Sequence, residues 1–317
     1  MKDKLSKITF RQLENLSTEQ PNRRSGQIDT ASVREILSII NQEDKKVAES
    51  VRKELRYIAE AVRLVVEGLK RGGRLIYVGA GTSGRIGVLD AAECPPTFGT
   101  SPKMIRAVIA GGNKAVFRSR EGSEDREAEG VRAMKNLKVS DRDVVCGIAA
   151  SIRTPFVMSS IIQAKKMRAK TIYITTNPRS KLQSRDFSSL RKSLDVAICP
   201  VVGSEVIMGS TRMKSGTAQK MVLNMISTAS MIRLGKVYQN MMIDLALNSR
   251  KLEERAKRVL MSATGVDYNS ARRMLKEAGG HVKTAIVMIK AEVSAREARR
   301  RLAEANGFVK KAIRGSL

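Results

Sequence analysis

The stretch that decides the fold is Arg74-Leu-Ile-Tyr-Val-Gly-Ala-Gly-Thr-Ser-Gly-Arg85, a short apolar run that ends in a glycine-rich turn. Similar runs recur along the chain, each followed by a longer segment with helical spacing: 105–109, 144–148, 171–174 and 196–199. Continuously apolar runs are typical of strands buried on both faces, and their alternation with helices indicates βαβ units. The sequence therefore predicts an α/β fold with a doubly wound, five-stranded parallel sheet flanked by helices.

The chain has 317 residues, of which 42% are hydrophobic, so it can bury one large core or two modest ones. Apolar residues at helical spacing predict helices before the sheet and, after about residue 262, a small C-terminal all-helical module. No apolar run approaches the roughly 20 residues that span a bilayer, and the first residues lack the apolar stretch of a signal peptide. We expect a soluble, cytoplasmic protein with no membrane partner.

Lysine and arginine together number 59 and aspartate and glutamate 31, a formal net charge of +28 that favours anionic partners. Proteins that bind single-stranded nucleic acid interleave basic residues with stacking aromatic residues, but aromatic residues make up only 3% of this chain. We therefore expect a solvated basic surface and keep nucleic-acid contact as a minor hypothesis.

The chain contains one histidine, His281, and three cysteines without metal-ligand spacing. This composition leaves no room for a His-based metal site or a Ser-His-Asp triad. We expect no bound metal, and chemistry that uses carboxylates, hydroxyls, amines, backbone dipoles or a borrowed cofactor.

The turn at 79–85 is a candidate phosphate site, because its glycines allow close backbone approach and Thr82 and Ser83 offer hydroxyl groups at the start of a helix. Its glycine spacing matches the dinucleotide fingerprint, but no acidic residue ends a second strand about 20 residues later. A tight strand-to-helix turn is the structural alternative.

Two further loops follow predicted strands and carry hydroxyl or basic side chains. Ser151 and Thr154 lie after the third strand, where we expect them to contact the same sugar phosphate. The segment 203–217 contributes further candidates for substrate binding: Ser210, Thr211, Arg212 and Lys214. Arg212 or Lys214 is expected to hold a carboxylate or phosphate.

Two carboxylates, Glu93 and Glu124, are candidates for acid and base catalysis. Pro95 and Pro96 are expected to end the helix that carries Glu93, which would leave that carboxylate near a rigid turn. The structural alternatives are a surface carboxylate at a helix end for Glu93 and an acidic helix N-terminus for Glu124.

Several stretches together closely resemble the N-acetylmuramic acid 6-phosphate etherases, and the resemblance covers nearly the whole chain. They are residues 74–85, Val88-Leu-Asp-Ala-Ala-Glu-Cys-Pro-Pro-Thr-Phe98, Glu121-Gly-Ser-Glu-Asp125 and Gly209-Ser-Thr-Arg-Met-Lys-Ser-Gly-Thr-Ala-Gln-Lys220. The resemblance implies a sugar isomerase (SIS) fold, a homodimer, and neither metal nor organic cofactor. It also implies an SIS sugar-phosphate domain over 54–256, an N-terminal arm and helix over 1–53, and a helical (UBA-like) module over 257–317.

The reaction that the resemblance implies converts N-acetylmuramic acid 6-phosphate into N-acetylglucosamine 6-phosphate and D-lactate. By the same resemblance, Glu93 matches the proton donor of the family and Glu124 its second catalytic carboxylate. We expect Glu124 to take the C2 proton and Glu93 to protonate the departing lactate. A sugar-phosphate-sensing regulator without turnover is the alternative, although such a protein has no need for an acid and a base.

The family usually has glycine where this chain has Ile152. A β-branched side chain is poorly tolerated at positive φ and blocks close backbone approach. We therefore expect this substrate loop to be altered.

Overall fold

The structure, a computed structural model, describes residues 16–244 and 250–315. These residues form two compact units. The first falls within residues 1–91 and 103–226, and the second within 92–102 and 227–317. Within the described residues, no helix is both long and apolar enough to cross a membrane.

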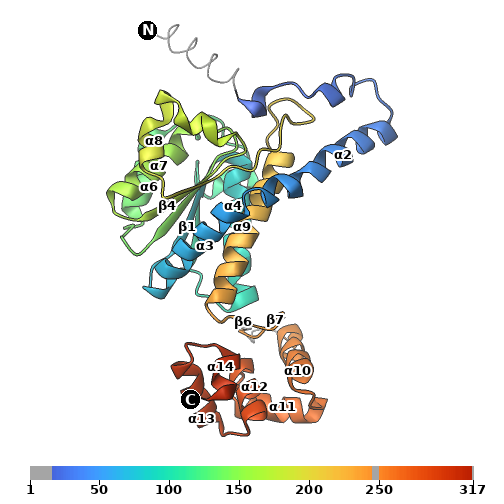
Figure 1. Cartoon of the computed structure of the whole chain (residues 1–317), viewed down its shortest axis with the longest axis vertical. Coiled ribbons are helices and arrows are strands. Elements are labelled where there is room, and N and C mark those ends of the chain that lie inside the picture. Colours follow the sequence, from blue (N-terminus) through green and yellow to red (C-terminus); the bar gives the residue numbers. More distant parts are fainter. Residues whose placement is uncertain (1–15, 245–249, 316–317) are drawn as a thin grey trace. The chain divides into compact units, whose positions relative to one another are not determined.

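A five-stranded, all-parallel sheet forms the centre of the first unit (Figure 1). Its strands are β1 (Leu75–Gly79), β2 (Ile105–Ile109), β3 (Val144–Ile148), β4 (Lys170–Ile174) and β5 (Val196–Ile198), in the order β2-β1-β3-β4-β5. The predicted doubly wound sheet is confirmed. In this order the chain changes direction across the sheet between β1 and β3, and ligands of such sheets bind beyond the strand ends at that switch point.

Helices cover the sheet because alternate strand side chains are buried on opposite faces. α3 (Leu55–Lys70) contacts β1, β3 and β5, whereas α7 (Pro155–Lys166) contacts β1, β3 and β4 and also packs on α6 (Glu127–Asn136). Ile76 and Val78 belong to the same apolar cluster as residues of α7. Tyr77 alternates with them, and its hydroxyl donates to Asp90 of α4 over 2.8 Å.

Helix α4 (Gly81–Phe98) is longer than expected, since it continues two residues beyond Pro96. The expectation that the two prolines end the helix beside Glu93 is wrong. Each proline removes the hydrogen bond that its own nitrogen would donate and crowds the carbonyl four residues earlier, but the helix continues through both positions. The helix instead ends at Phe98, after which the Gly99 nitrogen donates to the Pro95 carbonyl and Gly99 takes a positive φ.

Residues 16–25, called here the N-terminal segment, lie along the first unit. Ser17 donates its backbone N–H to Asn177, and Ser25 donates its hydroxyl to the Val206 carbonyl over 2.7 Å. The other elements outside the sheet are η1 (Ser17–Glu19), η2 (Arg23–Ser25), α2 (Val33–Arg52), α5 (Lys114–Phe117), η3 (Arg179–Gln183), η4 (Arg185–Phe187), α8 (Ser188–Lys192) and α9 (Lys214–Arg233). α2 begins with a capping box, because Ser32 and Glu35 bond each other's backbone N–H groups.

The second unit contains the predicted C-terminal helices and a short hairpin. Its elements are β6 (Val237–Tyr238), β7 (Met241–Met242), α10 (Arg250–Thr264), α11 (Tyr268–Glu277), α12 (Val282–Ala291), α13 (Ala295–Glu304) and α14 (Val309–Arg314). Side chains from these helices share one apolar core, in which Leu260 and Ile286 are fully buried. Asp267 and Ser294 cap α11 and α13 through their side chains.

Candidate functional site

A cavity of about 230 Å³ opens at the carboxyl ends of β1, β2 and β3, which is the switch point of the sheet. Its walls are the β1–α4 turn, the first residues after β2, residues 119–124 and the β3–α7 loop. Six of the residues singled out from the sequence line it: Thr82, Ser83, Glu124, Ser151, Thr154 and Thr211. We call it the switch-point cavity.

The β1–α4 turn has its tight shape because it is built from glycine. A Cβ atom at Gly79 would lie 2.6 Å from the Gly84 nitrogen, and Gly81 has a φ of +52°. Both conditions exclude an ordinary side chain. The turn therefore starts α4 directly at the cavity, where the helix N-terminus and its unpaired N–H groups attract anions.

Ser83 is linked to a buried amide of α9. Its hydroxyl donates to Oε1 of Gln219 over 2.9 Å, and Gln219 is fully buried. The Nε2 atom of that amide has no hydrogen-bond partner among the described residues. Rotating the amide by half a turn would let Nε2 donate to Ser83, which would then turn its own hydrogen toward a bound oxyanion.

A second helix N-terminus faces the cavity through the β3–α7 loop. Thr154 directly precedes α7 and lines the cavity together with Ser151. The Phe156 nitrogen donates to the Glu124 carbonyl over 2.9 Å, so the backbone of residue 124 is fixed beside the first turn of α7. The cavity thus combines two helix dipoles, several hydroxyl groups and two carboxylates, those of Glu121 and Glu124, a combination suited to a phosphorylated polyol.

Ile152 adopts the left-handed backbone region, with a φ of +64°, although it is β-branched. Its side chain is fully buried in the cluster of α7 and Tyr173, and the Tyr173 hydroxyl donates to the Ile152 carbonyl over 2.5 Å. Ile152 does not belong to the cavity lining. The loop therefore accommodates isoleucine by directing the side chain into the core.

Two arginines of the lining were not singled out from the sequence. Arg85 donates Nε to the Val116 carbonyl over 2.9 Å. Among the described residues, the one hydrogen bond of Arg120 is a long one of 3.4 Å to the Gly111 carbonyl. Arg85 lies within the quoted turn, but no pattern in the sequence indicates that Arg120 reaches the same cavity. Most N–H groups of Arg120 remain available to an anionic ligand.

Ser210, Arg212 and Lys214 are not brought to this cavity. Arg212 is exposed, whereas Lys214 is buried and its ammonium lies 2.5 Å from the Glu43 carboxylate. Burial alone would raise the pKa of Glu43, but hydrogen bonds from Lys214, Lys46 and Asn22 lower it from 4.5 to about 2. Lys214 is therefore part of a buried ion pair of α2 and α9.

Glu205 was also missed by sequence reasoning. Its carboxylate is fully buried and accepts the backbone N–H groups of Lys214 and Ser215 over 3.0 and 2.9 Å. It thereby satisfies the N-terminus of α9, so that this helix end is closed to a phosphate.

Glu93 is exposed on α4 and is absent from the lining of the switch-point cavity. It follows Thr82 by eleven residues on the same helix, which corresponds to about three turns and about 16 Å of helix axis. Glu93 and Thr82 thus share one side of α4 at different heights.

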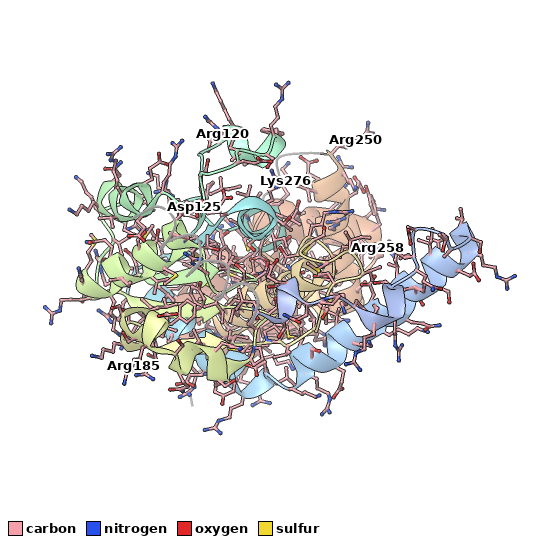
Figure 2. The ribbon with its side chains drawn as sticks, turned by 90° about the horizontal axis from the view of Figure 1, so that it is seen from above. Arg120, Asp125, Arg185, Arg250, Arg258 and Lys276 are labelled. Carbon is pink, nitrogen blue, oxygen red and sulfur yellow. The ribbon has the colours of Figure 1, made fainter. Side chains whose placement is uncertain are left out.

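No group of three or more His, Cys, Asp or Glu residues within 16–244 and 250–315 is arranged to hold a metal ion. The three cysteines are all buried free thiols. Cationic side chains project from elements of both units, including Arg185 and Arg258 (Figure 2).

Comparison with known proteins identifies close relatives over most of the chain. The family model "Glucokinase regulatory protein N-terminal SIS domain" matches residues 57–165. The chain is 58% identical to the N-acetylmuramic acid 6-phosphate etherase of Salinibacter ruber, over 91% of this chain and 90% of the relative. It is 52% identical to the protein of that name from Symbiobacterium thermophilum and 47% identical to the one from Clostridioides difficile, over 89% and 90% of this chain and 91% of each relative.

These alignments extend far beyond the matched SIS segment. Because they span about nine-tenths of both partners in each comparison, the chain belongs to the N-acetylmuramic acid 6-phosphate etherase family.

Proposed function

We propose that this chain is a carbon–oxygen lyase that cleaves the lactyl ether of N-acetylmuramic acid 6-phosphate, giving N-acetylglucosamine 6-phosphate and D-lactate in cell-wall amino sugar metabolism. The observation that carries the proposal is the switch-point cavity, which two helix N-termini, several hydroxyls and the glutamates Glu121 and Glu124 line. The names of the relatives favour this activity over that of a sugar-phosphate-sensing regulator.

The elimination step needs two proton transfers because an unactivated ether is a poor leaving group. Opening of the sugar ring exposes an aldehyde at C1, which acidifies the C2 proton. A carboxylate removes that proton, a C2–C3 double bond forms, and the C3–O bond breaks as an acid protonates the departing lactate. Water then adds its hydroxyl to C3 and a proton returns to C2, which balances the overall hydrolysis.

We assign the C2 proton to Glu124 and the protonation of lactate to Glu93. The position of Glu124 beside Ser151 and Thr154 supports its role, because it meets the sugar next to the groups that bind phosphate. Hydroxyls and helix dipoles at the same place would stabilise the developing enolate. Neither step requires a cofactor.

The phosphate is assigned to Thr82, Ser83, Ser151 and Thr154, and Thr211 closes the same cavity. Ser210 and Arg212 stay proposed substrate contacts on the neighbouring loop. For the lactyl carboxylate we favour Arg120 over Lys214, since Lys214 is already paired with Glu43 whereas Arg120 lines the cavity with most of its donors available.

We propose a cytoplasmic homodimer in which Glu93 of the partner subunit completes the site. Three buried free thiols support a reducing compartment. The absence of Glu93 from the lining in one copy supports a contribution from a second copy. The division into 1–53, 54–256 and 257–317 stays a proposal. The separate apolar core of the C-terminal helices supports a distinct helical module, although that core also includes Tyr238, Ile243 and Ala256. We propose no nucleic-acid partner, since aromatic residues make up only 3% of the chain.

The decisive experiment measures D-lactate release from N-acetylmuramic acid 6-phosphate by purified protein without added metal. Glu124→Gln is expected to abolish release, whereas Glu127→Gln, an exposed carboxylate outside the cavity, serves as the matched control and retains it. Absence of release by the folded wild-type protein would contradict the proposal, and saturable sugar-phosphate binding in that case would move the chain to the regulator class.

A further inference from the structure

The carbonyl of Ala150, in the β3–α7 loop, accepts hydrogen bonds from three consecutive residues that follow β4. Thr175 and Thr176 donate their hydroxyls over 2.9 and 3.2 Å, and Asn177 donates its side-chain amide over 2.8 Å. All three donor residues are buried. Because a carbonyl oxygen has two lone pairs, these side chains more than satisfy it, and the peptide between Ala150 and Ser151 is held in one orientation.

Ser151 follows this peptide and lines the switch-point cavity. Its own hydroxyl makes a long hydrogen bond of 3.5 Å to the Arg153 carbonyl, which is too weak to place it. On the other side of Ser151, the Tyr173 hydroxyl donates to the Ile152 carbonyl over 2.5 Å. Side chains within 173–177 therefore hold the backbone on both sides of Ser151, and this backbone sets where the Ser151 hydroxyl meets a ligand.

Asn177 also contacts the N-terminal segment. Its Oδ1 atom accepts the backbone N–H of Ser17 over 2.9 Å. Since an N–H can only donate and a carbonyl can only accept, the two contacts determine which end of the amide faces which partner. The Asn177 side chain thus joins two backbone groups that lie 160 and 27 positions away from it in the sequence.

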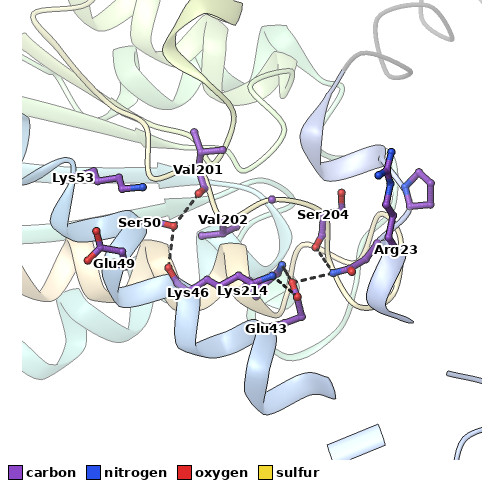
Figure 3. A pocket seen from close by; sticks show the side chains of 13 residues that line it. Arg23, Glu43, Lys46, Glu49, Ser50, Lys53, Val201, Val202, Ser204 and Lys214 are labelled. Carbon is purple, nitrogen blue, oxygen red and sulfur yellow. Dashed lines mark hydrogen bonds and ion pairs between the residues drawn. The ribbon is translucent and has the colours of Figure 1, made fainter. Parts of the chain in front are cut away.

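The N-terminal segment is held at a second point, where Asn22 meets a buried ion pair. The Asn22 amide donates to the Ser204 carbonyl and to the Glu43 carboxylate, each over 3.0 Å. Glu43 in turn pairs with Lys214, and both side chains are buried (Figure 3). The segment is therefore anchored independently of Asn177 and gives its amide a fixed partner.

We propose that Asn177 is a positioning residue of the switch-point cavity, which orients the Ser151 hydroxyl through the Ala150 carbonyl and is itself oriented by Ser17. The proposal rests on the function proposed above, in which Ser151 binds the phosphate of the sugar. Asn177 is fully buried and does not belong to the cavity lining, so it acts through Ser151 rather than on the ligand. Because hydrogen bonds weaken steeply when their geometry is lost, freeing this peptide weakens phosphate binding.

The test is a double-mutant cycle on the full chain, read by isothermal titration with N-acetylglucosamine 6-phosphate. It compares Asn177→Ala, Ser151→Ala and the double variant with the wild type, and circular dichroism verifies that each variant folds. We expect each single variant to bind about tenfold more weakly and the double variant to bind no more weakly than Ser151→Ala alone. Additive losses would overturn the proposal, because a merely structural role of Asn177 does not depend on the Ser151 hydroxyl. Wild-type affinity in Asn177→Ala would also overturn it.

A second pair of variants leaves the buried amide in place and tests its contact with the N-terminal segment. Ser17 is the first residue of η1, and Leu16 before it is extended, so proline fits at this position. Ser17→Pro removes the N–H that Asn177 accepts, whereas the matched control Ser17→Ala removes the hydroxyl and keeps that N–H. We expect Ser17→Pro to bind N-acetylglucosamine 6-phosphate about threefold more weakly and Ser17→Ala to match the wild type. Equal affinities of these two variants would contradict the proposed orientation of Asn177 by Ser17.

Failure of this inference and failure of the proposed lyase activity are distinguishable. A wild-type protein that binds the sugar phosphate without releasing D-lactate contradicts the activity, whereas the titrations still decide the role of Asn177. A folded wild-type protein that does not bind N-acetylglucosamine 6-phosphate would overturn the inference as well, because Ser151 would then hold no phosphate.

Discussion

Two opposing contributions to the free energy of unfolding meet at Ile152. Burial of its side chain stabilises the fold, and its positive φ destabilises it. Its side chain is fully buried, and truncating such a side chain to alanine costs about 2–5 kcal/mol. Its φ of +64° costs an L-residue about 1–2 kcal/mol relative to glycine. Since the free energy gained by burial exceeds the cost of the strained backbone, we expect the wild-type isoleucine to be more stable than alanine or glycine at this position.

The two substitutions Ile152→Ala and Ile152→Gly separate these contributions. Alanine loses the buried side chain and keeps the backbone strain, so we expect unfolding free energy to fall by about 2–5 kcal/mol. Glycine loses slightly more side-chain contact than alanine but relieves the backbone strain. It also gives the unfolded chain more conformational entropy, which lowers the free energy of unfolding by about 0.4–1 kcal/mol. We therefore expect glycine to be about 1 kcal/mol more stable than alanine and about 1–4 kcal/mol less stable than isoleucine.

Urea unfolding followed by circular dichroism measures the three free energies under one condition, with unchanged slopes as the check that the unfolding transition is the same. An alanine variant at least as stable as the glycine variant would refute the strained backbone at residue 152. A glycine variant more stable than the wild type would show that the cost of the strained backbone exceeds the free energy gained by burying the side chain, contrary to the expected ranking.

Four further measurements probe the sites. Gln219→Met should raise KM for the sugar phosphate about tenfold by removing the amide that orients a phosphate-binding hydroxyl, and unchanged steady-state kinetics would count against that role. Arg120→Gln should weaken substrate binding about tenfold but leave the affinity for N-acetylglucosamine 6-phosphate, which lacks the lactyl carboxylate, as it was; equal losses for both compounds would contradict this assignment. The pKa of Glu43 is lowered to about 2 in the folded protein, so its ionised carboxylate contributes about 3 kcal/mol to the free energy of unfolding. This contribution is complete above the unfolded pKa near 4.5 and is lost as the pH falls toward 2. Glu43→Gln should thus lower the free energy of unfolding more at pH 7 than at pH 3. When Glu93→Gln and Glu124→Gln proteins are mixed and exchange subunits, about a quarter of wild-type turnover should return, because half of the dimers are mixed and each mixed dimer has one intact site. No recovery despite proven subunit exchange would place both carboxylates in one subunit.

The sheet could be predicted from the sequence because its signal is local. Residues 75–78, 144–148 and 196–199 contain no charged side chain, as is typical of strands buried on both faces. Arg106 interrupts the run 105–109, which forms the edge strand β2, where Arg106 is exposed. The end of α4 was missed because the local effect of Pro95 and Pro96 is to break a helix, whereas the tertiary contacts that hold this helix through both prolines are not visible in the sequence.

The cavity was predicted in part, and the limit is again physical. Thr82 and Ser151 follow two neighbouring parallel strands, and the carboxyl ends of such strands lie at the same edge of the sheet, so their shared location follows from the topology. Lys214 looked like a ligand for an anion, but its partner Glu43 precedes it by 171 residues and no local pattern reveals such a pair. Arg120 lies on an irregular loop, whose course depends on tertiary contacts such as that between Phe156 and the Glu124 carbonyl.

The hydrogen bond between Asn22 and the Ser204 carbonyl joins residues 182 positions apart. A ribosome that adds about 5–20 residues per second incorporates Asn22 roughly 10–40 seconds before Ser204. The N-terminal segment therefore docks only after the loop that follows β5 has been made, and until then the carboxylate of Glu43 has no ammonium of Lys214 beside it. Translation speed, rather than the stability of the finished protein, sets how long this segment is open to proteases and chaperones.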